Sequence, residues 1–100
     1  MSDEAPSPPE GATARRTAII RNRRGLHARA AAKFVKLAFE FTSEITVAKG
    51  ESAVSGRSIM GLMMLAAGPG TEIELAATGP DAQRAVDALT ALVTGGFDES

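Results

Sequence analysis

The sequence predicts an α+β fold, an open-faced sandwich in which three helices cover one face of a four-stranded antiparallel sheet. Some short segments alternate apolar and polar residues, as strands with one wet face do. Longer segments place apolar residues at helical spacing. The expected order is β-α-β-β-α-β-α, and short strands with helices between them favour two packed layers. The pattern leaves the strand order open.

A strand and a helix are expected first. The strand covers 16–21, around Ala18 and Ile20, and a turn-like polar segment ends at Gly25. The helix is expected from Ala28 to Phe39, with four apolar residues at helical spacing: Ala31, Phe34, Val35 and Ala38. We interpret three phenylalanines as packing residues: Phe34, Phe39 and Phe41.

A hairpin and a short helix are expected next. Ile45 and Val47 alternate with polar residues, and the Lys49-Gly50 pair allows a tight turn into a strand over 52–54. Gly56 then breaks the chain. The next helix runs from Ile59 to about Leu65, and the preceding serine, Ser58, suits its N-cap.

The last strand and helix follow a turn at 68–70. The strand alternates three apolar with three polar residues: Ile73, Leu75 and Ala77 with Glu72, Glu74 and Thr78. Pro80 suits the first position of the last helix, and Asp81 its positive end. The helix ends at Gly95, and its buried stripe is expected to contain Ala82, Ala85, Val86, Leu89 and Val93.

A chain of 100 residues is expected to form one domain. We expect its core to be aliphatic, because the sequence has 4 Phe and no Trp or Tyr. The Pro-rich residues 1–12 are expected to form a disordered tail, 13–97 the domain and 98–100 a C-terminal tail. The absence of Cys excludes disulfides, thiolate metal sites and cysteine nucleophiles. Without a signal peptide or an apolar run of about 18 residues, we expect a cytoplasmic protein with no membrane insertion.

Basic residues cluster in one part of the chain. Between positions 15 and 36 there are eight of the 11 Lys and Arg and none of the 12 Asp and Glu, which predicts an electropositive face. These residues are Arg15, Arg16, Arg21, Arg23, Arg24, Arg29, Lys33 and Lys36. The face could meet nucleic acid or a phosphoryl group carried by an acidic partner. The one aromatic residue among these bases, Phe34, is assigned to packing, so the segment lacks aromatic stacking platforms and we expect no nucleic-acid partner.

His27 is the single histidine and, without Cys, the best available nucleophile. It follows Gly25 and directly precedes the expected helix, at or near the N-cap. The first amides of a helix lack internal partners and attract anions. A phosphoryl group on the imidazole could therefore bind the amides of Ala28 to Ala30, while Arg29 clamps its oxygens. No glycine pattern makes a nucleotide loop and no ligand cluster suggests a metal, so we expect no cofactor.

Two segments resemble known motifs. Residues 22–31, Asn-Arg-Arg-Gly-Leu-His-Ala-Arg-Ala-Ala, resemble the active-site signature of HPr, the histidine-containing phosphocarrier of the bacterial phosphotransferase system. Residues 58–63, Ser-Ile-Met-Gly-Leu-Met, resemble the regulatory-serine segment of that family. The separation of the two motifs and the element order also fit, and the resemblance covers about residues 13–97.

The resemblance implies a monomeric phosphoryl carrier rather than an enzyme. Enzyme I, charged by phosphoenolpyruvate, would phosphorylate His27 on Nδ1, and enzyme IIA domains would receive the group. Arg29 would stabilise the phosphohistidine, and Ser58 would be the target of HPr kinase/phosphorylase where the organism has one. An apolar patch with a basic rim would contact partners: Ile59, Met60, Met63 and Lys36. Leu62 and Leu65 would pack inward.

Two departures from the family concern the active-site segment. Ala30 stands where the family usually has proline, and Arg24 is bulkier than the small residue often found there. Since alanine is a good helix former, we expect the first turn to form and His27 to remain the acceptor. Three other readings stay open: a regulatory binding module of the same fold, a nucleic-acid-binding domain, and a hydrolase. The hydrolase is disfavoured because no second acid–base group is evident near His27.

Overall fold

The computed structural model describes residues 13–99, so the tail expected over 1–12 lies outside the described residues. Four strands, three α-helices and one short 3₁₀ helix follow in the predicted order, with the 3₁₀ helix added after the last α-helix. They are β1 (Thr13–Ile19), α1 (Ala28–Ala38), β2 (Glu44–Lys49), β3 (Ser52–Ser55), α2 (Ile59–Met64), β4 (Glu72–Thr78), α3 (Ala82–Thr94) and η1 (Gly96–Asp98).

The four strands form one antiparallel sheet in the order β1-β4-β2-β3. The first strand begins at Thr13 rather than at Arg16, because Thr13 pairs with Thr78 at the far end of β4. It also ends earlier than predicted, at Ile19. Ile20 still exchanges backbone hydrogen bonds with the turn before β4, to Thr71 O at 2.9 Å and from Gly70 N at 2.8 Å.

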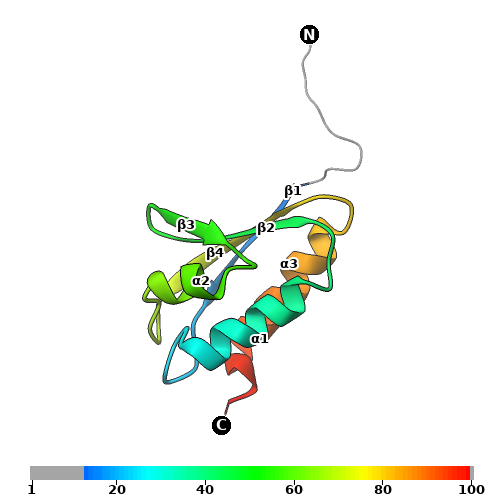
Figure 1. Ribbon diagram of the computed structural model, residues 1–100. Helices are drawn as coiled ribbons and strands as arrows, with labels where there is room; N and C mark the ends of the chain where they lie inside the picture. Colours follow the sequence, from blue (N-terminus) through cyan, green and yellow to red (C-terminus); the bar gives the residue numbers. More distant parts are fainter. Residues whose placement is uncertain (1–12, 100) are drawn as a thin grey trace.

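The helices form a second layer on one face of the sheet, which confirms the predicted open-faced sandwich (Figure 1). Helix α3 packs along β1 and β4, while α1 packs against both α2 and α3. The N-terminus of α1 and the C-terminal segment lie at the same end of the molecule (Figure 1). This end brings together parts of the chain that are far apart in sequence.

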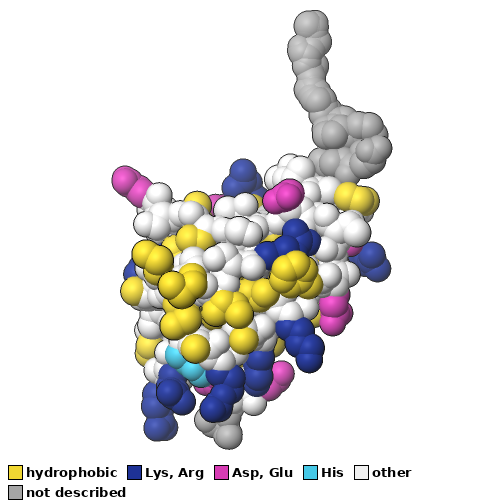
Figure 2. Space-filling model, viewed as in Figure 1, with side chains coloured by type: hydrophobic (Ala, Val, Ile, Leu, Met, Phe, Trp, Pro, Cys, Tyr) yellow, Lys and Arg dark blue, Asp and Glu magenta, His cyan; other side chains and the backbone are white. Residues whose placement is uncertain are grey.

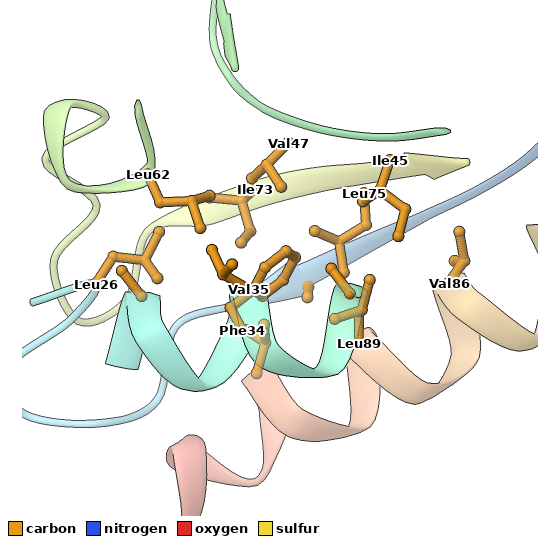
Figure 3. Packing of buried hydrophobic residues seen from close by; sticks show 14 of the residues in the cluster. Leu26, Phe34, Val35, Ile45, Val47, Leu62, Ile73, Leu75, Val86 and Leu89 are labelled. Atoms are coloured by element: carbon orange, nitrogen blue, oxygen red, sulfur yellow. The ribbon is translucent and has the colours of Figure 1, made fainter. Parts of the chain in front are cut away.

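The core lies between the sheet and the helices and is mostly aliphatic (Figure 3). Phe34 of α1 is fully buried, with Leu75 of β4 and Leu89 of α3. Every residue of the two predicted helical stripes is buried, which confirms the faces assigned to α1 and α3. Large side chains of this kind each contribute roughly 1.5–3 kcal/mol when fully buried, so burial of this core is the main favourable contribution to folding.

The prediction that Phe39 packs in the core is wrong. Phe39 is the C-cap of α1, and it is 65% exposed. Its ring lies 5.4 Å from the guanidinium of Arg57, a distance at which a cation and an aromatic face attract each other. Phe41, two residues later, packs against the core instead.

The prediction that Pro80 opens the last helix is also wrong. Helix α3 begins at Ala82, because Asp81 has φ −115° and ψ 30° and is not yet helical. The Asp81 carboxylate accepts hydrogen bonds from the loop before β2: from Thr42 N at 2.9 Å, Ser43 N at 3.0 Å and Ser43 Oγ at 2.5 Å. Asp81 therefore joins that loop to the start of α3 instead of capping the helix with its side chain.

Candidate functional site

The loop before α1 has little freedom. Gly25 has φ +65°, and a Cβ there would lie 2.4 Å from the carbonyl oxygen of Ala67. Only glycine fits both conditions. The next residue, Leu26, is buried and donates its N–H to Ala67 O at 3.0 Å. The loop is thus fixed to the segment after α2, and the position of the following residue is fixed with it.

That residue, His27, is the N-cap of α1, as the sequence predicts. Its backbone is extended, with φ −75° and ψ 177°, and its carbonyl accepts the N–H of Ala31 at 2.8 Å. The amides of Ala28, Arg29 and Ala30 precede this first helical bond and have no carbonyl one turn back to bind. The His27 side chain makes no cap hydrogen bond and is 16% exposed.

The His27 ring contacts a residue from the other end of the chain. Its Nε2 lies 2.5 Å from Oε2 of Glu99. The second carboxylate oxygen of Glu99 accepts from Asn22 Nδ2 at 3.1 Å, and the same amide group donates to Gly25 O at 2.8 Å. The hydrogen bond from His27, and then that from Asn22, lowers the pKa of Glu99 below its ordinary value. Glu99 is therefore an ionised acceptor at neutral pH.

The C-terminal segment turns back on itself to place Glu99. Gly96, Phe97 and Asp98 all have left-handed backbones, with φ of 72°, 57° and 62°. Non-glycine residues adopt this conformation at a cost of about 1–2 kcal/mol each. Full burial of Phe97 offsets that cost, and Lys33 Nζ of α1 binds Phe97 O at 2.7 Å. The segment is thus anchored to the core and to α1.

Basic side chains lie on one side of the histidine (Figure 2). Arg29 is exposed in the first turn of α1. A shallow pocket of about 360 Å³ is lined by Arg24, Arg29 and Lys33 together with Asp98 and Glu99. Figure 2 shows the histidine in cyan between a group of basic side chains and a group of exposed hydrophobic ones. This arrangement of an anion-attracting helix end, cations and an imidazole suits a bound phosphoryl group.

The hydrophobic group belongs mainly to α2. Ile59, Met60, Met63 and Met64 are its exposed large side chains, and Met64 is 78% exposed. Leu62 and Leu65 are buried, which confirms their predicted direction. Ser58 is the N-cap of α2, as predicted, and its Oγ accepts the N–H of Gly61 at 2.9 Å. Helix α2 packs against α1, where Lys36 is exposed in the last turn.

Neither a metal-ligand cluster nor a membrane-spanning helix is found among residues 13–99. That part of the chain contains no group of three or more His, Asp or Glu that could hold a metal ion. Nor does it contain a helix long and apolar enough to cross a membrane. The predicted site residues therefore fall into two adjoining regions, one around His27 and one on α2.

Comparison with known proteins gives the family. Residues 14–95 match the family model described as "PTS HPr component phosphorylation site". The chain belongs to the HPr family of phosphocarriers of the phosphotransferase system. It is similar to the phosphocarrier protein HPr of Neisseria meningitidis, with 55% identity over 80% of this chain and 90% of that protein. It is also similar to the phosphocarrier protein NPr of Shewanella violacea, with 49% identity over 85% of this chain and 93% of that protein.

Solved HPr structures share the fold. A crystal structure of HPr from Thermoanaerobacter tengcongensis superposes with a TM-score of 0.83 and 41% identity, over 87% of this chain and 98% of that one. The HPr fold of this chain thus rests on sequence and on structure together.

Part of this HPr-family site does not follow from the sequence. Glu99 lies in the segment 98–100, which was expected to be a tail, and the residue is 72 positions from His27. Asn22 was placed in the loop without a role. Its burial gave no sequence signal, although asparagine side chains often hydrogen-bond to nearby backbone groups in turns. The predicted interface does not include Met64, which is the most exposed large hydrophobic residue among residues 13–99.

Proposed function

We propose that the protein accepts a phosphoryl group on His27 from phosphoenolpyruvate-charged enzyme I and passes it to enzyme IIA domains, acting as a cytoplasmic monomer. One observation carries the proposal: an imidazole is the N-cap of α1, beside three amides that precede the first helical hydrogen bond. Membership of the HPr family supports the same conclusion.

The chemistry needs a site that holds a phosphoryl group without trapping it. The amides of Ala28, Arg29 and Ala30 would bind its oxygens, and the Arg29 guanidinium would add a planar pair of donors. Because the site is shallow and open to water, these contacts are weaker than in a closed pocket. Moderate binding suits a carrier, since over-stabilising the phosphorylated state would slow the next transfer.

The exposed face of α2 is proposed as the docking surface for enzyme I and enzyme IIA domains. Ile59, Met60 and Met63 would fill apolar pockets of the partners, with Lys36 and the bases near His27 meeting acidic residues. Methionine and arginine are both enriched at protein interfaces relative to the rest of the surface. No nucleic-acid partner is proposed.

Ser58 is proposed as a regulatory phosphorylation site for HPr kinase/phosphorylase, in an organism that has this enzyme. Its hydroxyl is the N-cap of α2, directly before the docking residues. A phosphate there would face the positive end of α2 and leave the helix intact. Its charge and bulk would instead weaken docking of enzyme I.

A two-step relay assay tests the proposed function. The protein is first charged with enzyme I, magnesium and phosphoenolpyruvate, then freed of enzyme I and mixed with an enzyme IIA domain. Loss of phosphate from the carrier with equal gain by the IIA domain is expected. A carrier that is charged but transfers to no IIA domain would support a regulatory module of the same fold instead.

A further inference from the structure

The contact between His27 and Glu99 determines where the imidazole proton lies. An ionised carboxylate can accept a hydrogen bond but cannot donate one. At 2.5 Å from Glu99 Oε2, Nε2 must therefore carry the shared proton. A neutral imidazole has one N–H, so its other nitrogen, Nδ1, then presents a bare lone pair.

Glu99 is held firmly enough to enforce this state. Its other oxygen accepts from Asn22 Nδ2 at 3.1 Å, and Asn22 is itself buried in the loop before α1. The backbone two residues earlier is fixed by the buried Phe97 ring and by Lys33. The Glu99 carboxylate thus contacts both the loop before α1 and the histidine, which holds it in place.

We propose that Glu99 is a positioning residue for His27, which orients the ring and keeps its proton on Nε2 so that Nδ1 exchanges the phosphoryl group. This inference rests on the proposed function. In the forward step the Nδ1 lone pair forms the N–P bond, while the bond from phosphorus to the donor breaks and its electron pair leaves with the donor. The ring becomes a cation, and the Glu99 carboxylate faces that new charge.

The reverse step needs no proton transfer either. The electron pair of the N–P bond returns to Nδ1, and the leaving group is a neutral imidazole that still carries its Nε2 proton. An imidazole without that proton would have to leave as an anion, which is a much poorer leaving group. The two nitrogens lie on different edges of the ring, so the carboxylate and the phosphoryl group occupy separate places.

Other charges near the ring do not replace this contact. Arg24 of the loop and Arg29 and Lys33 of α1 line the adjoining pocket and favour the phosphoryl dianion. Asp98 of η1 lines the same pocket and is exposed. Among residues 13–99, the hydrogen-bond partner of the His27 ring is Glu99.

Glu99→Gln tests the proposal with little change of shape. Its one amide oxygen can accept from Asn22 or from His27, but not from both, and its NH₂ group faces the other. When the NH₂ group faces Nε2, the proton must move to Nδ1, which blocks the nucleophile. Asp98→Asn is the matched control, since it removes one charge from the same pocket, and asparagine tolerates the left-handed backbone at that position.

Two measurements are made on full-length wild type and both variants. Imidazole ¹⁵N chemical shifts report which nitrogen carries the proton, and rates of charging by enzyme I are recorded across pH. We expect Nε2–H in wild type and in Asp98→Asn, and a raised Nδ1–H population in Glu99→Gln. We expect the rate of charging of Glu99→Gln to fall about tenfold. This is less than the ~10⁴-fold loss of rate when Asn replaces the buried Asp of a serine-protease triad and the histidine takes the wrong tautomer.

The outcomes separate the two proposals. If wild type is charged and Glu99→Gln shows the same tautomer and rates across pH, the positioning role is overturned. Faster charging of Glu99→Gln also overturns it, because Glu99 would then obstruct the site. If wild type is not charged by active enzyme I, the proposed function fails, and the inference built on it fails with it.

Discussion

At the scale of single residues, the site depends on His27 and Glu99. The sequence predicts the position of His27 but not that of Glu99. His27 could be predicted because a glycine turn precedes it and a helical pattern follows, so its place at the helix start is a local property. Glu99 reaches it from 72 positions away through three left-handed residues. No periodicity predicts such a contact, because it depends on where Phe97 packs.

Arg29 is expected to stabilise the phosphoryl group, since it extends from the first turn of α1 into the pocket beside His27. Arg29→Ala should slow charging by enzyme I about tenfold to a hundredfold, as the loss of one charge-assisted donor pair predicts. Arg84→Ala, an exposed arginine on α3, removes the same charge away from the site and serves as control. If Arg29→Ala and Arg84→Ala slowed charging equally, the rate would depend on the net charge of the protein and not on Arg29 itself.

At the scale of elements, the spacing of apolar residues correctly predicts the buried faces of the helices. It predicts the first and last residues of the helices and strands less accurately. β1 starts three residues early because β4 offers it partners as far as Thr78. Pro80 stands outside α3 because the Asp81 carboxylate is bound by the loop before β2. Each difference arises from a contact with a distant segment, which a local pattern does not contain.

Ser58 stabilises α2 through its cap. Ser58→Ala should lower the free energy of unfolding by about 1 kcal/mol, because the N–H of Gly61 loses its acceptor. Ser58→Asp should keep most of that stability while weakening enzyme I binding, since aspartate also caps helices. Urea unfolding and a binding titration measure the two effects. A large loss of stability in Ser58→Asp would contradict the view that phosphorylation leaves the fold intact.

The docking role of α2 can be tested with two matched isoleucines. Ile59 on α2 and Ile19 at the end of β1 are each 40% exposed. Ile59→Ala and Met60→Ala should each weaken enzyme I binding about tenfold, a cost of ~1.4 kcal/mol that is typical of interface anchors. Ile19→Ala should leave the affinity unchanged. Calorimetric titration with enzyme I measures all three, and unchanged binding by Met60→Ala would exclude this patch.

At the scale of the whole molecule, the two-layer architecture was predictable and the strand order was not. The order β1-β4-β2-β3 puts the last strand between the first two, a choice made by pairing between distant segments. That pairing, with α3 on β1 and β4, leaves the N-terminus of α1 and the end of the chain close together. The topology therefore creates the place where His27 meets Glu99.

The free energy of unfolding should fall at low pH because of Asp81, whose carboxylate binds the loop before β2 to the start of α3. Its hydrogen bonds, first that from the Ser43 hydroxyl, lower the pKa of Asp81 from 3.8 to about 2. A carboxylate with a lowered pKa stabilises the fold above its unfolded value and loses that contribution as pH falls. Asp81→Asn should therefore be less stable than wild type near pH 7, and the gap should shrink between about pH 4 and pH 2. A gap that stayed constant across thermal unfolding curves would contradict this.

The role of His27 as the residue that carries the phosphoryl group can be tested by counting phosphate on the protein. Wild type and His27→Ala are incubated with enzyme I, magnesium and phosphoenolpyruvate, and acid-labile, base-stable phosphate on each protein is counted. We expect close to one phosphate per wild-type chain and none on His27→Ala. Two results would contradict this role. One is a wild type that stays unlabelled although the same enzyme I charges another carrier, and the other is phosphate on His27→Ala.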